Sequence, residues 1–172
     1  IHIRISRLLW RFEISDLILR LRSAQEFEIG LERNFRPIFF TFNTSCMEIS
    51  KREKLIQAYL EAYNTMNVEG MVEPLHEDVV FENYSSGEKT HSIEGKSGFL
   101  KQAEEALAYF SKRKQTIETV RHLENETEVE ISYWAVAAMD FPNGIKKGQE
   151  LNLKGKSVFR FSKGKISSIQ DF

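Results

Sequence analysis

Several residue types are scarce in this chain of 172 residues, and each scarcity excludes a class of protein. Cys46 is the only cysteine, which excludes an internal disulfide and any zinc site built from several cysteines. No apolar run approaches the roughly 20 residues that a membrane-spanning helix needs. The 24 basic residues are balanced by 25 acidic ones, so no basic field would attract nucleic acid. We therefore expect a cytoplasmic protein that binds neither nucleic acid nor a membrane.

Hydrophobic residues, in contrast, are plentiful enough for a folded core. They make up 41% of the chain, and aromatic residues account for 12%. A chain of this length normally forms one domain and buries about 70% of the surface that its unfolded form exposes. The aromatic residues would suit either a core or the lining of an apolar pocket.

Composition changes abruptly at Met47. Residues 1–46 hold seven of the eleven arginines but no lysine and no methionine. This break predicts that residues 1–46 form an extension, disordered or non-native, and that the folded domain covers residues 47–172. Two alternatives stay open for the extension: an amphipathic helical arm over Ile1–Leu21, or a cleaved targeting peptide.

Hydrophobic periodicity predicts helices in the first half of the domain. Ser50-Lys51-Arg52-Glu53 has the form of a capping box, which would start the first of them. The predicted elements are a helix over 51–66, a short helix from Asn67 through Leu75, a strand over 79–84, a polar loop over 85–92 and a helix over 96–111. Lys112-Arg113-Lys114 would then lie at the end of the last helix, where basic residues complement the helix dipole.

In the second half of the domain the period changes to two, which is typical of strands. Turn-forming residues separate the alternating segments. The predicted strands cover residues 116–123, 129–139, 151–161 and 166–172. Helices followed by a run of antiparallel strands indicate an α+β fold, in which the helices pack on one face of a curved sheet.

Sequence motifs for common cofactors are incomplete. Gly-Lys-Ser occurs at Gly95–Ser97 and at Gly155–Ser157, but Thr90 and Glu150 stand where a phosphate-binding loop needs its first glycine. The four histidines form no metal-binding pair on a helix. We therefore expect no cofactor.

The domain resembles the nuclear transport factor 2-like superfamily, in its SnoaL-like and ketosteroid isomerase-like branch. The segments that carry this resemblance are Leu55–Tyr63, Asn67–Glu82, Gly95–Leu100 and Phe159–Phe172. The resemblance implies a cone-shaped, curved antiparallel sheet wrapped by three N-terminal helices, with an apolar pocket for a small apolar ligand or substrate.

Strand alternation indicates which side chains would face such a pocket. In the last strand Asp171 shares the more apolar face with Ile169, and Phe159 and Phe161 lie on the same face of the preceding strand. Burial among these residues would raise the pKa of the Asp171 carboxyl group toward the range that suits an acid/base catalyst.

The resemblance implies a role for several of these residues. Asp171 falls on the acid/base aspartate of the polyketide cyclases, and Tyr59 matches the tyrosine on the first helix of the ketosteroid isomerases. Asn83 and Ser157 stand in place of the two wall carboxylates of those isomerases. Because an amide and a hydroxyl group cannot shuttle a proton as a carboxylate does, the isomerase mechanism is incomplete here.

The scytalone dehydratases of the same superfamily match only in part. Tyr63 and His122 fall on a tyrosine and a histidine of their site. Asn64, Asn83 and Met139 replace the aspartate, the second tyrosine and the second histidine.

The candidate residues therefore fall into two groups. The candidate catalytic residues are Asp171, Tyr59 and His122, and the candidate pocket residues are Tyr63, Phe81, Asn83, Tyr133, Met139, Ser157 and Phe159. As alternatives, Tyr59 and Tyr63 would be core aromatic residues, and His122 would point to water at a strand edge.

Two functions remain open. In the first, the protein is a cyclase, isomerase or lyase that acts on an apolar carbonyl compound, with Asp171 moving a proton. In the second, it is a non-catalytic ligand-binding or dimerisation module of the same fold. Apolar residues on the opposite sheet face, together with the habit of the superfamily, also predict a homodimer: Trp134, Val136, Ala138 and Val158.

Overall fold

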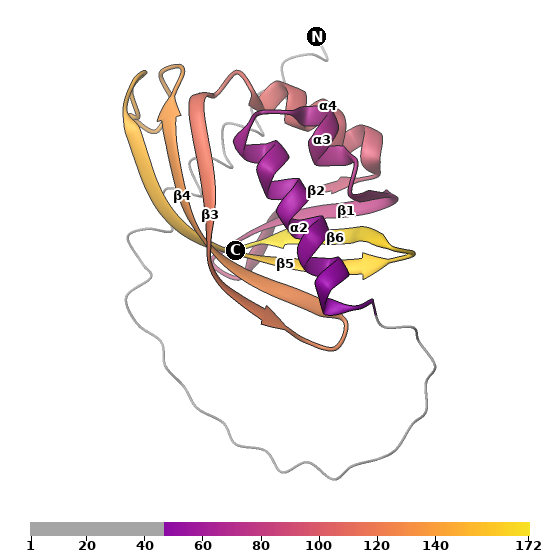
Figure 1. The fold of residues 1–172 in the computed structure, drawn as a ribbon. Helices are drawn as coiled ribbons and strands as arrows, with labels where there is room; N and C mark the ends of the chain where they lie inside the picture. The colour runs from indigo at the N-terminus through magenta and orange to yellow at the C-terminus, as the bar shows by residue number, and fades with distance from the viewer. Residues whose placement is uncertain (1–46) are drawn as a thin grey trace.

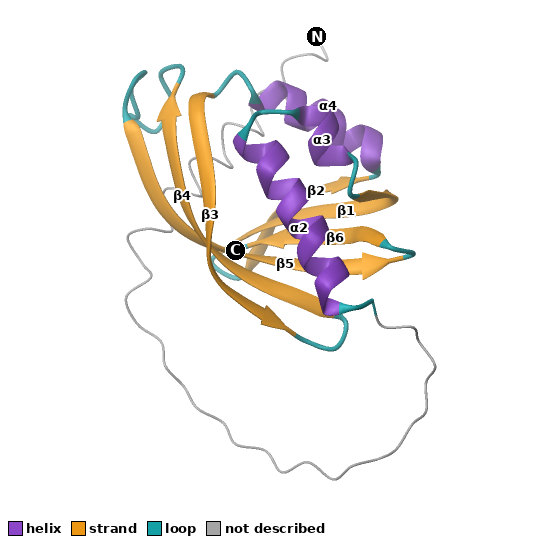
Figure 2. Cartoon of the chain, viewed as in Figure 1, coloured by secondary structure: helices purple, strands orange, loops and turns teal. Residues whose placement is uncertain are grey.

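The computed structural model describes residues 47–172, so the predicted extension, 1–46, lies outside the described residues and stays a prediction. Three helices and six strands make up the described part (Figures 1 and 2). The helices are α2 (Ile49–Asn64), α3 (Val68–Val72) and α4 (Lys96–Ala106). The strands are β1 (Leu75–Ser85), β2 (Glu88–Glu94), β3 (Phe110–His122), β4 (Glu126–Ala137), β5 (Glu150–Ser162) and β6 (Lys165–Asp171).

The strands form one curved sheet in the order β2-β1-β6-β5-β4-β3, and the helices cover its concave face (Figure 1). The predicted α+β class is confirmed. The sheet is not wholly antiparallel, however, because β1 and β6 pair in parallel while every other pair is antiparallel. This pairing places β6 in the middle of the sheet, so Asp171 has a strand on each side.

A hairpin replaces the predicted loop over 85–92. Ser86 and Gly87 both have positive φ, as a two-residue type I′ turn requires, and β2 pairs directly with β1 after it. The polar composition of β2 concealed a strand that is exposed on the edge of the sheet.

Helix α2 runs across the concave face and buries one side against the sheet (Figure 1). It begins at Ile49, and the predicted capping box is not formed, because no side chain caps the helix and Ser50 lies inside it. Asn67 does cap α3, since its side-chain oxygen accepts a hydrogen bond of 2.9 Å from the backbone of Gly70.

Two polar side chains, the buried Arg52 and the partly buried Asn64, attach the two ends of α2. The Arg52 guanidinium is 2% exposed and donates to four backbone carbonyl groups, those of Met47, Leu123, Glu124 and Glu126. At the other end the Asn64 side chain both donates to and accepts from the backbone of Gln115 in β3, at 2.9 and 2.7 Å. Together these bonds fix where α2 lies over the sheet.

Helix α4 ends at Ala106, and the chain enters β3 at Phe110. The prediction that Lys112-Arg113-Lys114 ends a helix is therefore wrong. These residues alternate as part of a strand, so Lys112 and Lys114 are exposed while Arg113 is buried.

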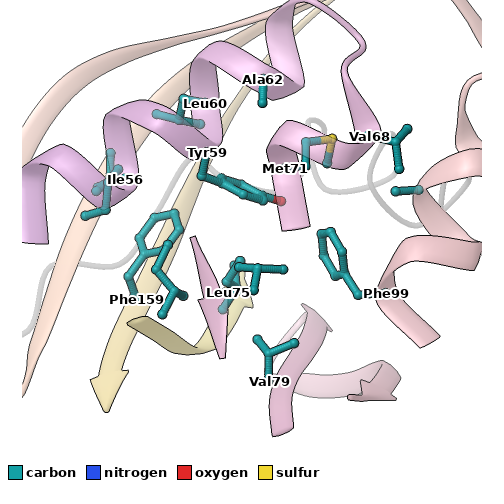
Figure 3. Packing of buried hydrophobic residues seen from close by; sticks show 14 of the residues in the cluster. Ile56, Tyr59, Leu60, Ala62, Val68, Met71, Leu75, Val79, Phe99 and Phe159 are labelled. Atoms are coloured by element: carbon teal, nitrogen blue, oxygen red, sulfur yellow. The ribbon is translucent and has the colours of Figure 1, made fainter. Parts of the chain in front are cut away.

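The core lies between α2, α3 and the sheet. Figure 3 shows Tyr59 projecting from α2 between Phe159 and Phe99, with its hydroxyl group on the side of Met71. The Tyr59 ring centroid lies 6.1 Å from that of Phe159 and 6.2 Å from that of Phe99. A second apolar cluster, which includes Phe110 and Phe141, fills the end of the sheet formed by β3 and β4.

The apolar residues on the outer face of the sheet do not form one patch. Trp134 of β4 lies opposite Asn152 of β5, whereas Val158 of β5 lies opposite Glu128 of β4. These two positions are six residues apart along the strands. At roughly 3.3 Å per residue this separates them by about 20 Å. The homodimer and its interface both stay predictions.

A chain that begins at Met47 should fold as well as the full chain. The composition changes at Met47, and the described residues from there on form a hydrophobic core of their own. We expect the shortened chain to keep a single cooperative thermal transition, measured by circular dichroism. Loss of that transition would show that residues 1–46 are part of the fold.

Candidate functional site

A cavity of about 200 Å³ lies between the helices and the concave face of the sheet. Its wall combines side chains from α2 and α4 with inward-facing residues of the sheet. Most of the wall is aromatic or aliphatic, and a few polar groups interrupt it, as is usual for small-molecule sites. Seven of the candidate residues line it: Tyr59, Tyr63, Phe81, Asn83, Tyr133, Ser157 and Asp171.

Asp171 is held at the centre of the sheet by its neighbours on both sides. In the register of the strands it lies opposite Ser157 of β5 and Asn83 of β1. The Ser157 hydroxyl group donates a hydrogen bond of 2.6 Å to the Asp171 carboxylate. The next residue, Phe172, exchanges two backbone hydrogen bonds with Lys156, which fixes the end of the strand beyond Asp171.

Tyr59 brings a protonated phenol to the same cavity. Burial, and next the negative charge of Asp171, raise the pKa of Tyr59 well above its ordinary value. A phenol in this state donates a hydrogen bond throughout the physiological pH range. The sequence prediction placed Tyr59 correctly, and the structure makes it both a core residue and a cavity residue.

Two further tyrosines lie deeper along the same wall. The planes of the Tyr63 and Tyr133 rings meet at 63°, and the ring centroids lie 6.4 Å apart. The two side chains also share a hydrogen bond. Burial raises the pKa of both phenols, and the charge of Arg113 partly offsets this shift for Tyr63.

Arg113 is the functional candidate that sequence reasoning missed. It lines the cavity, although it is only 6% exposed, and its guanidinium carbon lies 3.8 Å from the centroid of the Tyr63 ring. An irregularity in the β3–β4 pairing after Phe110 brings Arg113 to the inner face. Arg113, Gln115 and Ile117 alternate with exposed residues, and this alternation could have indicated that Arg113 faces inward. The assignment of 112–114 to a helix end obscured it.

Three candidate residues do not line the cavity. His122 lies at the far end of β3, where its ring nitrogens lie 3.0 Å from the Glu53 carboxylate and 3.1 Å from the Thr127 hydroxyl group. Met139 packs against the second apolar cluster, and Phe159 is a core residue that is 1% exposed. The structure therefore gives His122 a structural contact between α2 and the β3–β4 hairpin in place of the expected pocket position.

The cavity offers an acid/base group, hydrogen-bond donors and one buried cation, Arg113, and the less buried Lys154 and Lys156 also lie on its wall. Among the described residues, Asp171 is the only carboxylate on the cavity wall. No group of three His, Cys, Asp or Glu side chains within residues 47–172 is placed to hold a metal ion. In the same part of the chain, no helix is long and apolar enough to cross a membrane.

The family model of the SnoaL-like domain matches residues 56–169, and the chain belongs to this family. No curated protein matches the chain.

Solved structures of the same fold are similar at low sequence identity. A candidate polyketide cyclase from Xanthomonas campestris pv. campestris is 21% identical, with a TM-score of 0.60 over 71% of this chain and 89% of the other. A candidate SnoaL-like polyketide cyclase from Jannaschia sp. CCS1 is 11% identical, with a TM-score of 0.61 over 72% and 85%. AclR, a candidate hydroxylase from Streptomyces galilaeus, is 18% identical, with a TM-score of 0.60 over 73% and 90%. At these identities the likeness establishes the fold alone.

The buried phenols predict a loss of stability in alkali. In the unfolded chain tyrosines ionise near pH 10, whereas Tyr59, Tyr63 and Tyr133 stay protonated in the fold. The free energy of unfolding should be maintained up to about pH 10 and then fall, by up to about 1.4 kcal/mol per pH unit for each buried phenol. Denaturant titrations at several pH values would measure this slope.

Tyr59→Phe is the matched control for this effect. Because it removes one of the three phenols, it should reduce the alkaline slope by about a third, whereas all other ionising groups stay in place. An unchanged slope would contradict the assignment of Tyr59 as a protonated phenol.

Proposed function

We propose that the protein catalyses a cofactor-independent cyclase-, isomerase- or lyase-type reaction on a small apolar carbonyl compound. The observation that carries the proposal is the placement of the Asp171 carboxylate and the protonated Tyr59 phenol on the wall of one mostly apolar cavity. A base and a hydrogen-bond donor in one cavity are the two groups that proton abstraction beside a carbonyl group requires.

Each group has a defined part in the reaction. The Asp171 carboxylate takes a proton from the carbon next to the carbonyl group, and the electron pair of the broken C–H bond moves onto the carbonyl oxygen. The Tyr59 hydroxyl group donates a hydrogen bond to the enolate oxygen that forms. Asp171 then returns the proton at another position. Alternatively, the enolate carbon attacks a second carbonyl group in the same molecule and closes a ring, and Asp171 returns its proton to the oxygen of that second carbonyl group.

Ser157 positions the base. Its hydrogen bond of 2.6 Å holds one oxygen of the Asp171 carboxylate, and Ser157 and Asp171 both lie on the cavity wall. A bound apolar ligand would displace water from this mostly apolar wall, which would strengthen both the base and the hydrogen bond to the enolate.

A second candidate function is ligand binding without turnover. Asp171 is the only carboxylate that the described residues bring to the cavity wall, and His122, the second candidate acid/base group, lies outside it. A cavity with a single titrating group of this kind would also suit a binding protein.

Exchange of solvent deuterium separates the two functions. Apolar ketones that bind the protein would be incubated with it in heavy water, and loss of the proton next to the carbonyl group would be followed by NMR. We expect Asp171→Asn to slow this exchange by about 10²–10⁴-fold while ligand binding survives, because the amide keeps the shape of the carboxylate but cannot take a proton. Tyr59→Phe should slow it less, because one donor is lost and the base remains.

Asp140→Asn is the matched control, because Asp140 is an exposed aspartate that pairs with Lys146 away from the cavity. It should leave the exchange rate unchanged. Exchange at the native rate in Asp171→Asn would refute the proposed base, and bound ketones that never exchange would favour the binding module.

A further inference from the structure

Two arginines are buried in the described part of the chain, and their surroundings differ. The guanidinium of Arg52 donates to four backbone carbonyl oxygens and so acts as an anchor for α2. Arg113 donates through Nε to the Tyr63 carbonyl oxygen at 3.0 Å and through Nη2 to the Met71 sulfur at 3.6 Å. Sulfur is a weak acceptor, so the charge of Arg113 is far less well compensated.

No negative charge within residues 47–172 pairs with Arg113. The ion pairs of the described residues all involve other cations. Its contacts are with Tyr63 and Met71, both neutral, and the aromatic face of Tyr63 supplies a cation–π contact at 3.8 Å. Burying an unpaired charge is costly, and an anionic ligand bound at Arg113 would offset that cost.

The cation and the carboxylate occupy different ends of the cavity wall. Asp171 lies opposite Ser157 of β5. Arg113 lies opposite Ala135 of β4, and Ala135 in turn lies opposite Leu151 of β5. Leu151 precedes Ser157 by six residues, so the two charged residues are well separated along β5. Both charges act on the Tyr59 phenol: Asp171 raises its pKa and Arg113 lowers it. The buried charges of the cavity wall therefore lie apart, with Asp171 toward one end and Arg113 toward the other, whereas Lys154 and Lys156, which also line the cavity, are not buried.

These charges restrict the ligands that fit. An anionic group beside Asp171 would be repelled, and a wholly apolar molecule would leave Arg113 without a counter-charge. A carboxylate at the Arg113 end would match the planar fork of the guanidinium, which binds two carboxylate oxygens at once. The apolar body of the same molecule would then extend toward Tyr59 and Asp171.

We propose that Arg113 makes this cavity selective for organic acids, so that the ligand is an apolar compound with a carboxylate that Arg113 binds. The part of this proposal that concerns the substrate rests on the proposed function, because the ligand carboxylate would direct the reacting carbonyl group toward Asp171. As a statement about binding it is independent of turnover.

Pairs of ligands of equal shape test the proposal directly. Benzoate and acetophenone, hydrocinnamate and benzylacetone, and naphthoate and acetylnaphthalene each differ only in carrying a carboxylate or a methyl ketone. Isothermal titration calorimetry would give the ratio of the two affinities for each pair in the native protein and in variants. We expect the native protein to prefer at least one carboxylate over its ketone by about 10–100-fold, the usual value of hydrogen bonds to a charged group.

Three variants assign the preference to Arg113. Arg113→Gln should abolish it, and Arg113→Lys should keep only part of it, because an ammonium group cannot bind both oxygens in one plane. Arg160→Gln is the control, since Arg160 pairs with Glu126 on the outer face and is half exposed, and it should leave the ratio unchanged. The ratio of the carboxylate and ketone affinities is measured within each variant, so a general loss of folding would lower both affinities together. Circular dichroism would detect such a loss.

The outcomes separate this proposal from the proposed function. Equal affinity within every pair, failure of the native protein to bind any of the carboxylates, or a carboxylate preference that persists in Arg113→Gln would each overturn the role of Arg113. A preference that depends on Arg113 would support it, even if no ligand exchanges protons with Asp171.

Discussion

Helix α2 is held across the concave face of the sheet by hydrogen bonds between two polar side chains, the buried Arg52 and the partly buried Asn64, and the backbone of strands and turns. Arg52 binds the turn between β3 and β4, and Asn64 binds β3 itself. Arg52 lies in the protein interior, where leaving a buried partner atom unpaired costs about 1–3 kcal/mol. The position of the helix over the sheet is therefore specified by directional contacts as well as by apolar packing.

The site follows from this attachment. Tyr59 and Tyr63 project from α2 toward the sheet, and the aromatic contacts of Tyr59 set the depth at which its hydroxyl group lies (Figure 3). The parallel pairing of β1 with β6 brings Asp171 to the middle of the sheet beneath the helix. Residues distant in sequence thus meet in one cavity because one helix is fastened over one curved sheet.

The sequence predicted the inward face of the strands well, because period-two alternation is a local property. Phe81, Asn83, Tyr133, Ser157 and Asp171 were placed correctly by parity alone. Arg113 and His122 were not, and both lie on β3. Two features of β3 decided their positions: its pairing with β4 is irregular after Phe110, and the strand begins earlier than its apolar residues indicate. Both features depend on the partner strand. The β2 hairpin was missed because its exposed side chains are polar.

The central claim is that the cavity beneath α2 holds one small molecule between Arg113 and Asp171. A crystal structure of the protein with bound naphthoate tests it most directly. The account predicts that the carboxylate lies within hydrogen-bond distance of the Arg113 guanidinium and that the rings lie against Tyr59, toward Asp171. Naphthoate bound on the outer face of the sheet, or bound in the cavity with its carboxylate directed away from Arg113, would contradict it.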